Sequence, residues 1–269
     1  MNWYRPAVMA GKFYPKEKSH LTRMLTDFHT PVAKTKEKMR AIFVPHSGYR
    51  YCGKIAGDVY KQIEIPSTVI ILSPNHTGKG PFLSFWDEGS WDTPLGKVHV
   101  HAEMAEKLRV NAGEIHSDMM GHLSEHSIEV QLPFLQFQNP HVKIVPIVLG
   151  PLRLENCKKL GESFAKTLKD EKDFMIVVST DMTHYQTAEV AKQKDDLALE
   201  KVLAMDPEGL YQVVEENQMS MCGFIPMAAA LFTLKALGNS EAKLVSYGNS
   251  ARINHDLKSV VSYASGTFK

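Results

Sequence analysis

FMIVVSTDMTH, residues Phe174 to His184, is an uninterrupted apolar run that ends in hydroxyl, carboxylate and imidazole side chains. The run is rich in β-branched residues and too short to span a membrane, so it predicts a buried parallel strand covered on both faces. Ligands of open α/β sheets bind just beyond the carboxyl ends of the strands. We therefore expect Asp181 and His184 to lie at the mouth of a site.

Two earlier segments repeat this pattern, namely AIFVPH, which ends at His46, and VIILSPNH, which ends at His76. A single histidine after a strand is more often a hydrogen-bonded loop residue than a ligand. Three apolar strands that each end near a histidine favour a shared site, because imidazole is a common ligand of iron, zinc and copper. His46 and His76 can meet in space if their strands are neighbours in the sheet, and we expect them to satisfy that condition.

The residues alone leave the third ligand open. Asp181 would complete a face of two histidines and one carboxylate, the arrangement that leaves open positions on iron(II). Cys222 is the other candidate, because it precedes an apolar helix, and a helix N-terminus stabilises a thiolate. The plainer interpretation makes Cys222 a small buried hydrophobic residue.

His126 and Glu129 are one helical turn apart and could face the same pocket. A helix-cap network without catalytic meaning explains the pair equally well. His99 and His101 alternate on a short predicted strand without standing at its end, and we expect both on the surface.

Strands and helices alternate along the chain, and two strands follow the last helix. This order predicts a single α/β domain over residues 1–269, with a central, mostly parallel mixed sheet flanked by helices. The segments 18–28, 52–63, 102–110, 123–137, 154–168, 189–205, 207–217 and 224–237 are predicted helices. The segments 39–45, 68–73, 142–149, 174–180, 242–247 and 259–264 are predicted strands, and a hairpin or surface flap is expected over 82–91.

Composition limits the functional classes. The chain has 269 residues, 43% of them hydrophobic, and a formal net charge of +1, which gives no electrostatic argument for binding nucleic acid or an anionic membrane. Three cysteines fit neither a disulfide framework nor a CxxC zinc site, and no apolar leader or membrane span is evident. We expect a cytoplasmic protein. Phosphate-loop, dinucleotide-binding and GxSxG motifs are missing, which disfavours those enzyme classes.

The sequence resembles the Memo family, prokaryotic type, in short motifs whose order covers nearly the whole chain. These motifs are RPAV (5–8) with GKFYP (11–15), PHSGY (45–49) with YCG (51–53), EHSIE (125–129), STDMTH (179–184) and MCG (221–223). The sequence departs from the family pattern at Phe224–Pro226, where a more polar residue is expected before the proline.

The resemblance implies a fold similar to that of class III LigB-type non-haem iron extradiol dioxygenases. It also implies a metal site at His46, His76 and Cys222, in which the thiolate replaces the dioxygenase carboxylate. Asp181 and His184 would then be nearby acid/base or supporting residues. We include His126 beside them as a further candidate catalytic residue. Human members of the family are linked to phosphotyrosine-peptide binding and to copper or iron redox handling.

Three functions follow as hypotheses. The first is a metal-dependent oxidoreductase that uses iron(II) or copper, with zinc as a further candidate metal. The second is a non-catalytic protein that binds a peptide or a small molecule on a degenerate dioxygenase fold. The third is a zinc hydrolase in which Asp181 assists a metal-bound water. The sequence leaves the oligomeric state unknown.

Overall fold

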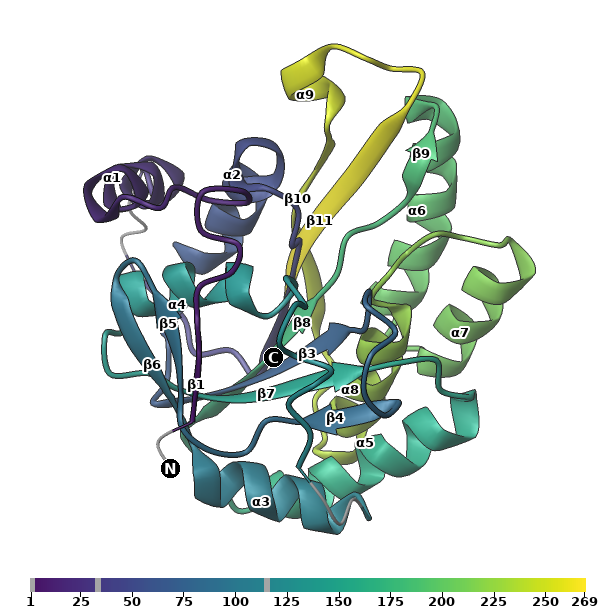
Figure 1. Ribbon diagram of the computed structural model, residues 1–269. Helices are drawn as coiled ribbons and strands as arrows, with labels where there is room; N and C mark the ends of the chain where they lie inside the picture. The colour runs from purple at the N-terminus through teal and green to yellow at the C-terminus, as the bar shows by residue number, and fades with distance from the viewer. Residues whose placement is uncertain (1–2, 32–34, 114–116) are drawn as a thin grey trace.

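The computed structural model describes residues 3–31, 35–113 and 117–269. Within them, eleven strands form one mixed sheet, with the main order β1-β5-β6-β7-β3-β8-β2-β11-β10 (Figure 1). The strands are β1 (Tyr4–Arg5), β2 (Ala41–Val44), β3 (Thr68–Pro74), β4 (Leu83–Phe85), β5 (Ser90–Thr93), β6 (Gly96–Val100), β7 (Lys143–Leu149), β8 (Phe174–Ser179), β9 (His184–Gln186), β10 (Ala242–Asn249) and β11 (Val260–Phe268). The predicted single-domain α/β fold is confirmed.

The centre of the sheet consists of the parallel strands β7, β3, β8 and β2. Every residue of β2, β3 and β8 is buried, as expected for strands covered on both faces. Because these strands are parallel, their carboxyl ends open onto the same edge of the sheet. The segments that follow β2, β3 and β8 therefore meet at that edge.

Helices cover the sheet on both sides. They are α1 (Lys18–Phe28), α2 (Tyr49–Tyr60), α3 (Ala102–Asn111), η1 (Glu129–Gln131), α4 (Leu132–Gln138), α5 (Leu154–Leu168), α6 (Ala188–Leu203), α7 (Pro207–Glu216), α8 (Phe224–Ala236) and α9 (Ala251–Asn254). Figure 1 shows α1, α2 and α4 on one side, and α3, α5 and α8 on the other. Helix α8 packs on β3 and β8 and is buried over most of its surface, which explains its nearly continuous apolar sequence.

Antiparallel strands extend the sheet at both margins. Strand β11 pairs with β2, β10 and β9, which confirms the predicted late strand pair. The hairpin expected over residues 82–91 is wrong, because β4 pairs with β7, whereas β5 pairs with β1 and β6. Both segments keep their strand character, but β4 pairs with the distant β7, and β5 forms its hairpin with β6, the next strand along the chain.

The helix predicted over residues 123–137 begins later than expected. Residues 117–128 form turns, η1 follows, and α4 has Pro133 in its first turn, where a proline is tolerated. No helix in the described part of the chain is long and apolar enough to cross a membrane.

Candidate metal centre

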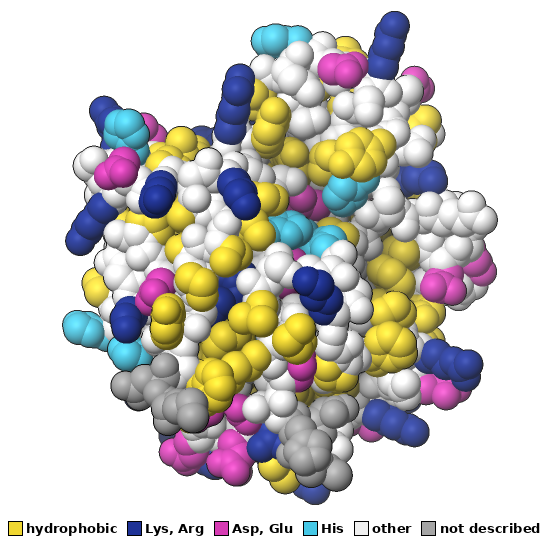
Figure 2. All heavy atoms as spheres, in the orientation of Figure 1, with side chains coloured by type: hydrophobic (Ala, Val, Ile, Leu, Met, Phe, Trp, Pro, Cys, Tyr) yellow, Lys and Arg dark blue, Asp and Glu magenta, His cyan; other side chains and the backbone are white. Residues whose placement is uncertain are grey.

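Three histidines converge at the carboxyl edge of the sheet. His46 follows β2, His76 follows β3, and His126 lies in the turns before η1. Their metal-binding ring atoms all lie within 4.8 Å of one another. The ring centroids are 5.0 Å apart for His46 and His76, 5.2 Å for His46 and His126, and 4.6 Å for His76 and His126. Histidine side chains gather near the centre of the face shown in Figure 2.

The two sequence-predicted ligands meet although their strands are not neighbours. Strand β8 lies between β3 and β2 in the sheet. His46 and His76 nevertheless approach each other, because both residues stand on loops beyond the strand ends. His46 is buried, whereas the side chains of His76 and His126 keep 31% and 21% of their surface exposed. An ion could therefore reach the cluster from solvent.

The hydrogen bonds around Ser179 fix the tautomer of His46. The Ser179 hydroxyl donates its one proton to the Ser127 carbonyl at 2.7 Å and accepts from Gln131 Nε2 at 2.9 Å. His46 Nδ1 lies 3.0 Å from the same hydroxyl oxygen, so this nitrogen must carry the proton. The lone pair of His46 is then on Nε2, which is the arrangement that a metal-binding imidazole requires.

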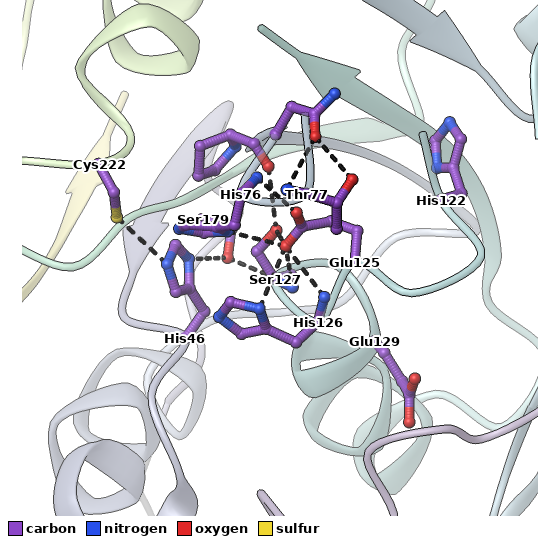
Figure 3. Close-up of polar contacts among 12 residues, drawn as sticks. His46, His76, Thr77, His122, Glu125, His126, Ser127, Glu129, Ser179 and Cys222 are labelled. Carbon is purple, nitrogen blue, oxygen red and sulfur yellow. Dashed lines mark hydrogen bonds and ion pairs between the residues drawn. The ribbon is translucent and has the colours of Figure 1, made fainter. Parts of the chain in front are cut away.

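Glu125 organises the other two histidines (Figure 3). Its buried carboxylate accepts from His76 Nδ1 at 2.9 Å and from the His76 backbone N–H at 2.7 Å, and it lies 3.2 Å from His126 Nδ1. The Ser127 hydroxyl and backbone N–H also donate to it, at 2.8 and 3.1 Å. A carboxylate behind an imidazole orients the ring and directs its Nε2 lone pair toward a metal.

The pKa shifts agree with neutral imidazoles beside an ionised carboxylate. Burial, together with the nearby rings of His126 and His76, lowers the pKa of His46 well below its ordinary value. Burial also lowers the pKa of His126. Burial acts to raise the pKa of Glu125, but the hydrogen bond and charge of His76 outweigh it, and the pKa falls. The donor set therefore fits a metal cation, because His46 directs its Nε2 lone pair into the cluster and the Glu125 carboxylate stands behind His76 and His126.

Cys222 reaches the same cluster from another element. Its loop precedes α8, and Cys222 Sγ lies 3.2 Å from His46 Nε2. In Figure 3 the thiol approaches the His46 ring from the side opposite to Glu125. Burial and the nearby Asp181 raise the pKa of the Cys222 thiol, so a thiol without a metal is protonated and can donate to the Nε2 lone pair.

Asp181 lies beside this group, with its carboxylate directed at the backbone of the His46 turn. Asp181 Oδ1 accepts from the His46 N–H at 2.8 Å, and Oδ2 accepts from the Ser47 hydroxyl at 2.5 Å. The Asp181 N–H in turn points at Cys222 Sγ, 3.3 Å away. Asp181 thus fixes two of the sequence-predicted ligands. It binds the backbone of the His46 turn through its carboxylate and the sulfur of Cys222 through its own N–H.

His184 stands further out, at the start of β9. Its Nδ1 lies 3.0 Å from the Ser220 carbonyl, which means that Nδ1 carries the proton and Nε2 the lone pair. His184 adds to the electrostatic lowering of the pKa of His46, so it faces the same region. Tyr185 beside it is 75% exposed and has a φ of 57°.

Glu129 does not share a pocket with His126. Its carboxylate points away from the histidines in Figure 3 and binds Arg5 at 2.5 Å and the Tyr14 hydroxyl at 2.6 Å. Arg5 also donates to the carbonyls of His122 and Glu125, at 2.7 and 2.6 Å. This buried cluster therefore fastens the N-terminal segment to the turns that carry Glu125 and His126. His99 and His101 lie away from the site, and His101 caps α3.

Sequence reasoning gave no role to Glu125, Ser179 or Ser127. Ser179 is the last residue of β8, a position that could have drawn attention to it. Glu125 lies in a turn region without periodicity, and only its place beside His126 could have suggested a role.

Comparisons with known proteins agree with these features. The family model described as "Memo-like protein" matches residues 5–267. A "MEMO1 family protein" of Aquifex aeolicus (strain VF5) is 40% identical over 96% of this chain and 97% of its own length. A "MEMO1 family protein" of Sulfurisphaera tokodaii is 39% identical over 98% of both chains.

Solved structures also share the fold. One of them is the crystal structure of uncharacterized protein JW3007 from Escherichia coli K12, which covers 84% of this chain and 99% of its own, with a TM-score of 0.51 and 13% sequence identity. That likeness concerns the fold alone. The full-length family match and the identity to the curated relatives show that this chain belongs to the Memo family.

Proposed function

We propose that this protein is a metal-dependent oxidoreductase with one iron(II) or copper ion at the histidine cluster. The observation that carries the proposal is the orientation of the imidazoles. His46 and His76 both have Nδ1 bonded to a residue behind the ring, which leaves the lone pair on Nε2 of each for a metal. His46 and His76 are therefore the two ligands common to every donor set considered below.

The third ligand is Cys222 in our proposal, with His126 as the alternative. Cys222 Sγ is 3.2 Å from His46 Nε2, whereas His126 brings its ring nitrogen within 4.8 Å of both other histidines. A thiolate is a soft donor and favours copper(I), iron or zinc over hard cations. If Cys222 is the ligand, His126 remains beside the ion as a neutral imidazole with a lowered pKa.

A bound iron or copper ion would supply Lewis acidity and one-electron chemistry at this edge of the sheet. The chain itself supplies orientation and proton transfer. Asp181 fixes the His46–Ser47 turn and thereby positions one imidazole. His184 presents Nε2 with its lone pair, because Ser220 holds Nδ1, and can accept a proton from a substrate as a general base.

The test is metal analysis of protein purified without oxygen. We expect about one iron or copper ion per chain in the wild type, since each donor set provides a single site. His46→Ala should lose the metal, whereas His99→Ala, which removes an exposed histidine away from the cluster, should keep it. Unchanged metal content in His46→Ala would exclude the site.

Two further variants decide the third ligand. Cys222→Ser should weaken binding and change the metal preference if the thiolate is a ligand, whereas His126→Gln should do so if the imidazole is.

Oxygen uptake with a panel of catechols then separates an oxidoreductase from a protein that only binds its ligand. Bound metal without any oxygen uptake would favour the binding function, and zinc-dependent ester cleavage would favour the hydrolase.

A further inference from the structure

A pocket of about 210 Å³ lies beside the candidate metal centre. It is lined by the last residues of β3 and β7, by the segments that follow these strands and by residues of helices α7 and α8, and it is open to solvent on one side. Cys222 lines this pocket while its sulfur lies 3.2 Å from His46 Nε2. The pocket and the candidate metal centre therefore share one wall, at the edge of the sheet where α/β proteins bind ligands.

The wall of the pocket is mainly apolar. Leu152, Phe224 and Ile225 contribute aliphatic and aromatic surface, and the Tyr211 ring packs edge-on against Phe224 with a centroid distance of 5.5 Å. Leu152 and Phe224 are only half-buried although they are large hydrophobic residues. Their exposed surface faces a concave site, which is the usual character of a small-molecule pocket.

The polar groups of the wall are already engaged. The Tyr211 hydroxyl donates to the Leu152 carbonyl at 3.2 Å. The Asn75 side chain bonds only within its own loop, to Thr77, Gly78 and Lys79. Lysine and arginine are absent from the described residues that line the pocket, and Glu215 is its one carboxylate. A neutral group gains most here, because a mainly apolar wall penalises the burial of a charge and no cationic side chain lines the pocket.

The volume limits the size of the ligand. A cavity of roughly 150 Å³ lined by apolar side chains can hold benzene. The 210 Å³ found here accommodates one six-membered ring or a branched chain of similar size, but not a fused polycyclic ring system with substituents.

We propose that this pocket binds the neutral, single-ring or similarly sized hydrocarbon part of the substrate and places the adjoining functional group next to Cys222. This assignment names the substrate class of the oxidoreductase proposed above and rests on it. The binding step itself depends only on the pocket, so it can be tested separately from the metal.

Benzyl alcohol is a suitable probe, because it is a neutral single ring with a polar end. Saturation-transfer NMR titrations with the metal-free full-length protein should give saturable binding, and benzoate should bind at least tenfold more weakly. Glu215→Gln, which changes an exposed side chain, should reduce the difference between the two probes. Equal binding of benzyl alcohol and benzoate by the wild type would overturn the proposal.

Leu152→Trp fills the pocket and should weaken benzyl alcohol binding at least tenfold. Leu257→Trp is the matched control, since Leu257 is 64% exposed and lies on the loop between α9 and β11. Binding that survives Leu152→Trp, or is absent from the wild type, would overturn the pocket assignment. Circular dichroism shows whether each variant is folded, and Glu215→Gln provides an independent test if Leu152→Trp is not.

Metal content measured on the same variants separates the two proposals. Leu152→Trp should keep the metal, and His46→Ala should lose it while still binding benzyl alcohol. A wild type that binds benzyl alcohol at this pocket but takes up no metal would refute the proposed function alone. A metal-loaded wild type that ignores benzyl alcohol would refute the pocket alone.

Discussion

Glu125 Oε1 lies 2.9 Å from His76 Nδ1 and 3.2 Å from His126 Nδ1, so one buried oxygen is shared by two of the three clustered imidazoles. Five N–H and O–H groups of the chain donate to this carboxylate. Glu125, which is not one of the expected ligands, thus controls the orientation of the His76 and His126 rings and the position of their protons.

Replacing Glu125 with glutamine should weaken metal binding by about 10- to 100-fold, the range found for residues behind metal-bound histidines. The amide removes the negative charge and presents an N–H group that can clash with His76 Nδ1–H. Competition with a chelator measures the change. Asp195→Asn is a matched control, because Asp195 is a buried carboxylate that binds Thr183 and Tyr247 instead. An unchanged affinity in Glu125→Gln would contradict this role.

Metal affinity should rise with pH if Cys222 is a ligand. Burial raises the pKa of the thiol, so binding must release its proton, whereas the buried His46 is already neutral at pH 7. We expect about a tenfold gain in affinity per pH unit between pH 7 and 9, measured by competition titration. In Cys222→Ser the dependence should nearly vanish. A flat profile in the wild type would point to His126 as the third ligand.

The sequence predicted the converging histidines because buried parallel strands leave a clear signal. The fully buried β2, β3 and β8 could be located to within one or two residues, and their shared direction brings His46, His76 and Asp181 to one edge. The placement of Cys222 beside His46 also agrees with the ligand set expected from the family resemblance. Which of the clustered donors bind a metal stays a prediction.

The sequence could not predict the supporting contacts, because they join irregular segments far apart in the chain. Glu125 lies in turns without hydrophobic periodicity, and its partner His76 is 49 positions away. Arg5 contacts Glu129 across 124 positions. The same limitation explains the wrong hairpin over 82–91, since β4 pairs with the distant β7, whereas β5 forms a local hairpin with β6 instead of β4.

Acid should destabilise the protein through His122. Burial lowers the pKa of His122 from 6.5 to about 4, and its Nε2 lies 3.1 Å from the Ser84 carbonyl while Nδ1 has no partner. Between these pH values the unfolded chain binds more protons, so stability is complete above pH 6.5 and falls toward pH 4. The loss attributable to this residue is on the order of 3 kcal/mol.

Urea unfolding of the wild type and His122→Gln at pH 7, 5.5 and 4.5 measures how much unfolding free energy His122 costs the protein in acid. The glutamine amide can still donate to Ser84 but does not titrate, so the variant should lose less stability in acid than the wild type. His141→Gln, an exposed position, controls for the loss of a histidine alone. The buried His46 and the partly exposed His126, whose pKa values burial also lowers, add to the acid sensitivity of all three proteins. Parallel pH curves for the wild type and His122→Gln would refute the assignment.

Arg5→Met should be strongly destabilising, by about 3–5 kcal/mol in urea unfolding, because it leaves Glu129 as a buried charge without its counter-ion. Both side chains are fully buried, and the Tyr14 hydroxyl and the Met9 N–H are the remaining donors to Glu129. The double variant Arg5→Met/Glu129→Gln should recover part of the loss, since the unpaired charge is gone. Recovery should be incomplete, because Arg5 also holds the carbonyls of His122 and Glu125.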